Sequence, residues 1–223
     1  MMVSTAFMLE NSLSDNEAQE GLYPEEVTMT VRLTAIAFIL AAPFAASAFA
    51  QTVGSEVQRD INQENRIEQG LKSGQLSTGE AARLEKGEAR IDKMESKAVK
   101  DGTLSPQEAA RIQRAQNQES EAIHRAKHNA VTGNPESASS QRMQADVQRN
   151  INQQSRIEQG IQSGQLTNKE TSQLERGQAR VDRAEARVGA DGHVSAREQV
   201  RIQNRENNQS QRIYRDKHNK RLR

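Results

Sequence analysis

The histidines and carboxylates are the residues of this 223-residue chain that could bind a metal ion. His124 and His128 stand four positions apart, so on a helix both imidazoles would lie on one face and could meet one transition metal. The nearby sequence offers no third strong ligand, and Lys127, His128 and Asn129 also fit an ordinary cationic helix end. Two interpretations therefore remain open for the pair: a metal site or a helix terminus.

No catalytic constellation is recognisable, which predicts a protein that is not an enzyme and needs no cofactor. The chain has no cysteine nucleophile, its serines lie outside nucleophile-elbow contexts, and its glycines form no phosphate-binding loop. The carboxylates stand among many Arg and Lys residues, so we interpret them as solvated charges on helix surfaces. After residue 50 the aromatic residues are reduced to Tyr214, which argues against a role that stacks bases or flavins.

Four short motifs, each a Ser or Thr followed three residues later by Glu, predict where helices begin. In such a capping box the hydroxyl accepts a hydrogen bond from the third helical amide, and the glutamate accepts one from the cap amide. A Gly and an aliphatic residue precede each motif, as expected for a turn before a helix. The motifs are Ser77 with Glu80, Ser105 with Glu108, Thr167 with Glu170, and Ser195 with Glu198.

The segments that lead into Glu108 and Glu198 resemble the second half of an EF-hand calcium loop. Asp101 and Asp191 precede a glycine, an aliphatic residue and the final glutamate in the order that this family uses. The resemblance implies calcium ligands at these four residues. The first and third positions of both loops carry no oxygen ligand, and helix capping accounts for the same residues without an ion.

The chain contains an internal duplication. Residues 57–129 align with residues 147–219 without a gap, and about half of the positions are identical. Apolar residues recur at helical spacing in three stretches of each copy, as Val57, Ile61 and Ile67 do in the first. We therefore predict an all-α fold made of two tandem, antiparallel three-helix units.

The predicted units are repeat 1 at residues 51–129 and repeat 2 at residues 145–223, joined by a linker at 130–144 that is rich in Gly, Pro and Ser. The organisation is similar to tandem-repeat helical proteins exported by Gram-negative bacteria, a likeness that implies fold and compartment but no activity. Each copy has few large aliphatic residues, so one copy alone is marginally stable. We expect the copies to pack together, the chain to self-associate, or a partner to complete the core.

Residues 29–50 have the pattern of a secretory signal peptide. Arg32 precedes an apolar run that ends in small residues, which predicts cleavage after Ala50, with cleavage after Ala48 as the alternative. A membrane anchor is the alternative, but the strongly apolar part is too short to span. Residues 1–28 carry acidic residues and no basic one, the wrong charge for a signal peptide, so we interpret them as a misassigned N-terminal extension. The mature protein is expected in the periplasm or outside the cell, without an anchor.

Charge differs between the two copies. Residues 51–141 hold 13 basic and 14 acidic residues, and residues 142–223 hold 17 and 10. The leading hypothesis is an envelope binding or scaffold protein that engages an anionic polymer or a protein partner, not nucleic acid, through repeat 2. A solvated helical surface without a partner is one alternative, and a divalent-metal buffer or sensor is the alternative function. An enzyme of unrecognised type is a further alternative. The candidate arginines are Arg201, Arg205, Arg212 and Arg215.

The signal-peptide hypothesis predicts the N-terminus of the mature protein. Mass spectrometry of protein recovered from the periplasm should give a chain that begins at Gln51, or within trimming of it, and carries no acyl group. An intact Met1 terminus in a membrane fraction would contradict the hypothesis.

Overall fold

The computed structural model describes residues 42–219, with side chains from residue 53 onward, and within this part every regular element is a helix. The all-α prediction is confirmed. The predicted extension and most of the signal peptide lie outside the described residues. The elements are α1 (Ala42–Ser73), α2 (Thr78–Ala98), α3 (Pro106–Lys127), α4 (Ala138–Gln162), α5 (Asn168–Val188), the short 3-10 helix η1 (Gly189–Asp191) and α6 (Ala196–Lys217).

All four predicted capping boxes are present, and they fix the starts of α2, α3, α5 and α6. At the start of α6, Ser195 Oγ accepts a hydrogen bond from the Glu198 amide at 3.3 Å, and the Ser195 amide donates to Glu198 Oε2 at 3.0 Å. Gly102 and Gly192 turn the chain before two of these helices with φ of +88° and +84°, a region that favours glycine. The helix boundaries therefore follow from local sequence chemistry.

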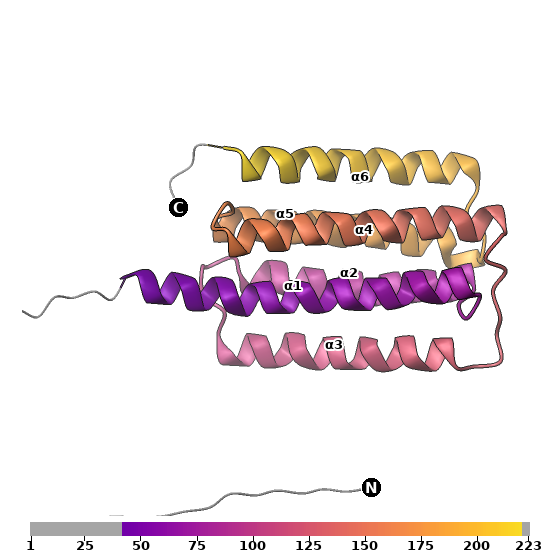
Figure 1. Cartoon of the computed structure of the whole chain (residues 1–223), viewed down its shortest axis with the longest axis horizontal. Helices are drawn as coiled ribbons and strands as arrows, with labels where there is room; N and C mark the ends of the chain where they lie inside the picture. The colour runs from indigo at the N-terminus through magenta and orange to yellow at the C-terminus, as the bar shows by residue number, and fades with distance from the viewer. Residues whose placement is uncertain (1–41, 220–223) are drawn as a thin grey trace, which may run out of the picture. The chain divides into compact units, whose positions relative to one another are not determined.

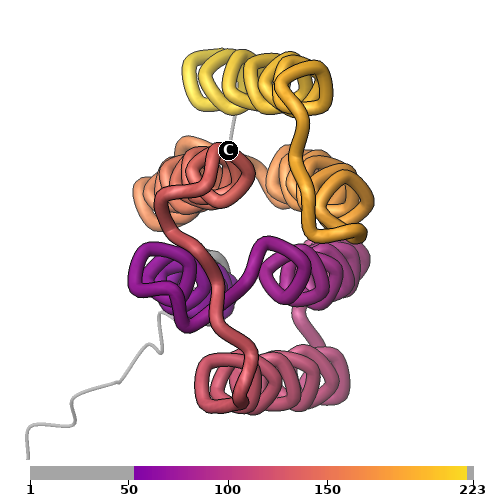
Figure 2. Tube along the Cα trace, turned by 90° about the vertical axis from the view of Figure 1, so that its right-hand side faces the viewer, coloured from indigo at the N-terminus to yellow at the C-terminus, as the bar shows by residue number. Residues whose placement is uncertain are grey.

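Four helices, α1, α2, α4 and α5, form the centre of the unit, with α3 and α6 on opposite outer sides (Figure 1, Figure 2). The closest packing joins the two repeats, because α1 lies along α4 and α2 lies along α5. Ser96 and Ser172 mark the α2–α5 contact, where each hydroxyl donates to the other residue's carbonyl at 2.7 and 2.6 Å. The expectation that the copies pack together thus agrees with the structure.

The apolar core runs along these contacts between helices. The predicted stripe of α1 is buried, with Val57, Ile67 and Leu71 fully inaccessible and Ile61 6% exposed. Its counterparts in α4, such as Val147 and others of the same cluster, complete the core from the second repeat. No helix of the described residues has an apolar stretch long enough to cross a bilayer.

Removing a cap should weaken the fold by a modest amount. Ser195→Ala deletes the hydroxyl that satisfies the Glu198 amide, so the free energy of unfolding should fall by about 0.5–2 kcal/mol, and Ser105→Ala should behave alike. Urea denaturation measures this change. Gln173→Ala, at an exposed position inside α5, is the control and should alter stability by a few tenths of a kcal/mol at most. Equal effects at the caps and at the control would contradict the capping role.

Candidate metal centre

The acidic residues of α2 and α5 face the interior. Both helices are rich in charge, yet every Asp and Glu on them is buried and every Lys and Arg is exposed. On α2 the inward residues include Glu85, Glu88, Asp92 and Glu95, which recur every three or four positions. The interpretation of the carboxylates as solvated surface charges is wrong for this set.

Apart from the capping glutamate Glu170, eleven carboxylates at most 3% exposed occupy the interior of the bundle. Among the described residues, one of the eleven forms an ion pair: Glu206 Oε2 lies 3.0 Å from Arg149 Nη1. Burying a carboxylate without a basic partner is costly, so the set needs protons, amide donors or cations to compensate it. The eleven are Asp60, Glu64, Glu85, Glu88, Asp92, Glu95, Asp146, Glu175, Asp182, Glu185 and Glu206.

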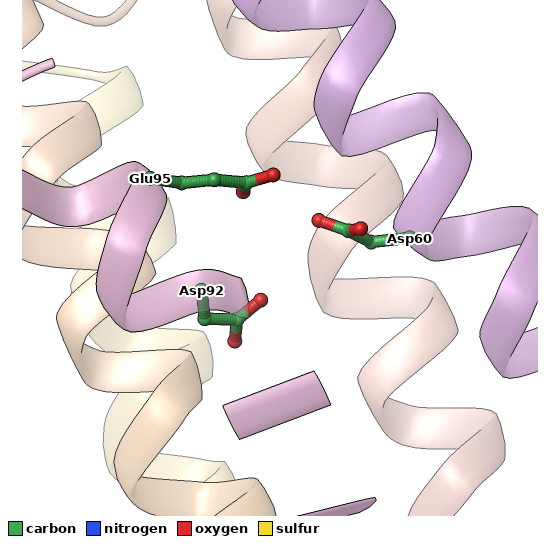
Figure 3. Close-up of side chains that lie close together, drawn as sticks. All are labelled: Asp60, Asp92 and Glu95. Carbon is green, nitrogen blue, oxygen red and sulfur yellow. The ribbon is translucent and has the colours of Figure 1, made fainter. Parts of the chain in front are cut away.

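One group of three joins α1 to α2. The carboxylates of Asp60, Asp92 and Glu95 point into the same space, and one oxygen of each lies within 4.8 Å of the others (Figure 3). Gln116 of α3 borders this group, donating from Nε2 to Asp60 Oδ1 at 2.8 Å and to Glu95 Oε1 at 3.3 Å. The carbonyl oxygen of this buried amide has no hydrogen-bond partner. One oxygen of each carboxylate, Asp60 Oδ2, Asp92 Oδ2 and Glu95 Oε2, also has none, so the group has oxygens free to accept a further positive charge.

A second group of three draws on both repeats. Glu64 of α1, Glu85 of α2 and Asp182 of α5 again place one oxygen each within 4.8 Å of one another. Both oxygens of Glu85 lack a hydrogen-bond partner, and so do both oxygens of the neighbouring Glu88. Asp92 of the first group and Asp182 of the second lie close enough for each to affect the pKa of the other, which links the two groups of three.

The duplication supplies an internal comparison for both groups. At the positions in repeat 2 that match Asp60 and Glu64, the chain has Asn150 and Gln154. These amides donate to buried carboxylates: Asn150 Nδ2 to Glu185 Oε2 at 2.8 Å, and Gln154 Nε2 to Asp92 Oδ1 at 3.1 Å. At these two positions repeat 2 therefore has amides, one of which donates to its own Glu185 and the other to Asp92 of repeat 1, whereas repeat 1 has further carboxylates. The exchange runs the other way at Gln116 of repeat 1, because the matching residue of repeat 2 is Glu206.

Burial raises the pKa of these carboxyl groups. The pKa of Asp60 and of Asp182 rises to about 7 and that of Glu206 to about 8, with loss of hydration as the largest cause. Loss of hydration also raises the pKa of Glu85 well above its ordinary value, and repulsion from Glu64 and Asp182 adds to the effect. Near neutral pH this interior binds protons in the absence of another cation.

The histidines and loop residues singled out from the sequence lie elsewhere. His124 and His128 are exposed on α3 and stack with ring centroids 4.2 Å apart, and His128 Nδ1 lies 2.8 Å from the His124 carbonyl oxygen. Tyr214 and His218 repeat this stacking at the end of α6, where Tyr214 stands at the position that matches His124. Within the described residues, no His takes part in a cluster of three or more candidate ligands.

The EF-hand-like residues have local hydrogen-bonding roles. Asp101 Oδ1 accepts from the Thr103 amide at 3.2 Å, and Asp191 Oδ1 accepts from the His193 amide at 2.9 Å. Glu108 and Glu198 are the glutamates of two capping boxes. The structure does not bring any of these four into a cluster of three or more ligands among the residues that it describes.

The predicted partner-binding arginines lie along α6. Arg201, Arg205 and Arg215 are exposed and Arg212 is half-buried. Arg205 and Arg212 line a shallow depression together with Arg180 of α5, so two of the four meet a basic residue of the neighbouring helix. Arg215 pairs with the adjacent Asp216 at 3.4 Å.

The fold and the buried groups define a class of protein: an all-helical chain whose interior is lined with carboxylates. No protein-family model matches this chain, and neither curated proteins nor solved structures match it. The positions and contacts of the buried carboxylates are therefore the evidence for what the protein binds.

The raised pKa values predict an unusual pH dependence of the metal-free protein. A carboxyl group whose pKa is higher in the folded than in the unfolded state stabilises the fold fully at pH values below its unfolded pKa of about 4. This stabilisation is lost as the pH rises through the folded pKa of about 7 to 8. The free energy of unfolding, measured in urea with a chelator, should therefore fall between pH 5 and pH 8. The fall should exceed about 1.4 kcal/mol, the equivalent of a tenfold change in the proton affinity of one group.

The variant Asp60→Asn checks the origin of this pH dependence. It removes one of the buried carboxyl groups that bind protons near neutral pH, so its stability should vary less with pH than that of the parent chain. A parent stability that rises from pH 5 to pH 8 would contradict the prediction.

Proposed function

We propose that the protein binds hard divalent cations in its interior, at the groups Asp60–Asp92–Glu95 and Glu64–Glu85–Asp182. The single observation that carries the proposal is the comparison between repeats. At the positions of Asn150 and Gln154, whose amides donate to buried carboxylates, repeat 1 has Asp60 and Glu64, and several buried oxygens accept no hydrogen bond. A cation would compensate these oxygens in the way that the two amides compensate Glu185 and Asp92.

The donor set selects the class of cation. Each group offers three carboxylates. Beside the first group, the Gln116 carbonyl oxygen adds a neutral ligand when the side-chain amide is flipped so that its oxygen takes the place of Nε2. Oxygen ligands without sulfur or imidazole suit Mg²⁺, Ca²⁺ and Mn²⁺ rather than copper or zinc. The 4.8 Å limit on the oxygen separations is compatible with metal–oxygen bonds of about 2.1–2.5 Å on opposite sides of one ion.

Cation binding competes with protons at these groups. Since burial raises the pKa of the carboxyls, a cation that enters must displace protons, and its affinity should rise with pH. The six carboxylates lie on α1, α2 and α5, which the cations would hold together, so binding would stabilise the folded chain. This behaviour suits a buffer or a sensor and requires no catalytic group.

The remaining proposals concern location and organisation. We propose that the chain is exported and acts without catalysis in the cell envelope, as two tandem three-helix repeats. In support, residues 29–50 have a basic residue, an apolar run and small residues before Ala50, and the internal duplication begins after that position, at residue 57.

Binding of an anionic or protein partner through repeat 2 is the second candidate function. The exposure of Arg201, Arg205 and Arg215 supports it. A test on an isolated repeat is unsuitable, because α4 and α5 pack against α1 and α2 along their length. Substitutions in the full chain are required instead.

Metal binding is tested by calorimetry and thermal unfolding of the metal-free chain at pH 7.5. Mg²⁺, Mn²⁺ or Ca²⁺ should raise the melting temperature, because a ligand at about a hundred times its Kd stabilises the folded state by about 2.7 kcal/mol. The heat of binding should vary with the ionisation enthalpy of the buffer, because protons are released.

The matched variant for this test is Asp60→Asn with Glu64→Gln, which copies the residues that repeat 2 already has at these positions. It should fold, gain stability without metal at pH 8, and lose the response to Mn²⁺ and Ca²⁺. Glu121→Gln, at an exposed carboxylate of α3, should retain the response. Retention of the full response by the double variant, or no response of the parent chain to any of the three hard cations, would refute the proposal.

A further inference from the structure

The outer face of α2 and α5 is rich in exposed basic residues. Five basic residues of each helix are exposed, and the acidic residues of the same helices all lie inside. The two helices lie side by side on one side of the unit (Figure 2). The exposed residues are Arg83, Lys86, Arg90, Lys93 and Lys97 on α2 and Lys169, Arg176, Arg180, Arg183 and Arg187 on α5.

A groove runs between the two helices within this surface. Lys93, Lys97 and Lys100 line one wall, Arg176, Arg180 and Arg183 line the other, and the small side chains of Ser96 and Ala179 lie between them. The groove has a volume of about 410 Å³. Small residues between two walls of cations leave room for a chain of anionic groups to lie along the helices.

Among the described residues, the basic side chains of this groove form no ion pair with a carboxylate. Within the described part of the chain, the ion pairs involve Lys72, Arg125, Arg149 and Arg215, none of which lies on α2 or α5. The carboxylates of the same two helices lie buried in the interior, away from this outer face. The face therefore carries a concentrated positive potential.

The chemistry of the face selects among anionic partners. The large exposed hydrophobic residues of the described chain are Val131, Val200 and Tyr214, all outside α2 and α5. A helix that inserts into a bilayer needs an apolar face, and a site for single-stranded nucleic acid uses aromatic side chains for stacking. The outer face of α2 and α5 has neither. Arg and Lys side chains along a groove fit the phosphate groups of an unbranched chain without rings.

We propose that the groove between α2 and α5 binds a linear polyanion whose anionic groups are phosphates. Contacts from both walls would hold successive phosphates of one chain, so a polymer would bind far more tightly than a single phosphate ion. The surface lies outside the carboxylate core, and this inference does not rest on cation binding there.

The test uses the full chain and long-chain inorganic polyphosphate, with affinity measured by fluorescence anisotropy of a labelled polymer over a range of salt. Affinity should fall steeply with salt, because several phosphates are neutralised at once. Arg176→Gln with Arg180→Gln and Arg183→Gln should weaken binding at least about tenfold and lower the slope of log affinity against log salt by about two to three.

The matched control carries the same change of charge on another helix. Arg111→Gln with Arg114→Gln and Arg125→Gln alters three exposed arginines of α3 and should change affinity less than about threefold. Because glutamine keeps a helix propensity close to that of arginine, both triple variants should fold.

Three outcomes would overturn the proposal. The first is an equal loss of polyphosphate affinity in the groove variant and the control variant. The second is tighter binding to phosphatidylglycerol vesicles than to polyphosphate, and the third is comparable affinity for orthophosphate and the polymer. A fourth comparison separates this groove from the α6 surface: if replacing Arg201, Arg205, Arg212 and Arg215 with Gln abolishes binding while the groove variant retains it, α6 is the binding surface and the groove is not.

Discussion

The loss of hydration of the inward-facing carboxylates is the constraint on which the rest of the structure depends. An apolar interior would stabilise a bundle of this size without such groups, whereas this interior places eleven carboxylates at most 3% exposed among its aliphatic residues. Their compensation is divided: amides of repeat 2 donate to some of them, and others retain unpartnered oxygens. The folded state is therefore linked to whatever positive species, proton or metal ion, occupies the interior.

The same constraint organises the outside of the molecule. Because α2 and α5 direct all their acidic residues inward, their basic residues are left on the surface without acidic neighbours on the same helix. A helix with balanced composition thus presents one sign of charge to the solvent. Formal net charge understates this effect: the first repeat has nearly equal numbers of acidic and basic residues, yet α2 contributes half of the basic face.

Local chemistry made the helices predictable from the sequence, and the site was harder to predict. The capping motifs at Ser77, Ser105, Thr167 and Ser195 fix helix starts through contacts within four residues, and the structure has all four. The burial of the carboxylates depends instead on how α2 meets α1 and α5, which no local pattern specifies. One signal was present: Glu85, Glu88, Asp92 and Glu95 repeat at the three- and four-residue spacing of core positions. Because acidic residues are usually exposed to water, this spacing was not interpreted as a core pattern.

The close packing of α1 on α4 and of α2 on α5 has a consequence for how the chain acquires its structure during synthesis. The ribosome releases repeat 1 first, with three of the six proposed ligands on α2 and two on α1, but Asp182 and the helices that cover them arrive only with repeat 2. Without α4 and α5 to cover them, the carboxylates of α1 and α2 would be more open to water, and the loss of hydration that raises their pKa would be smaller. The raised pKa values in repeat 1 therefore depend on its packing against repeat 2.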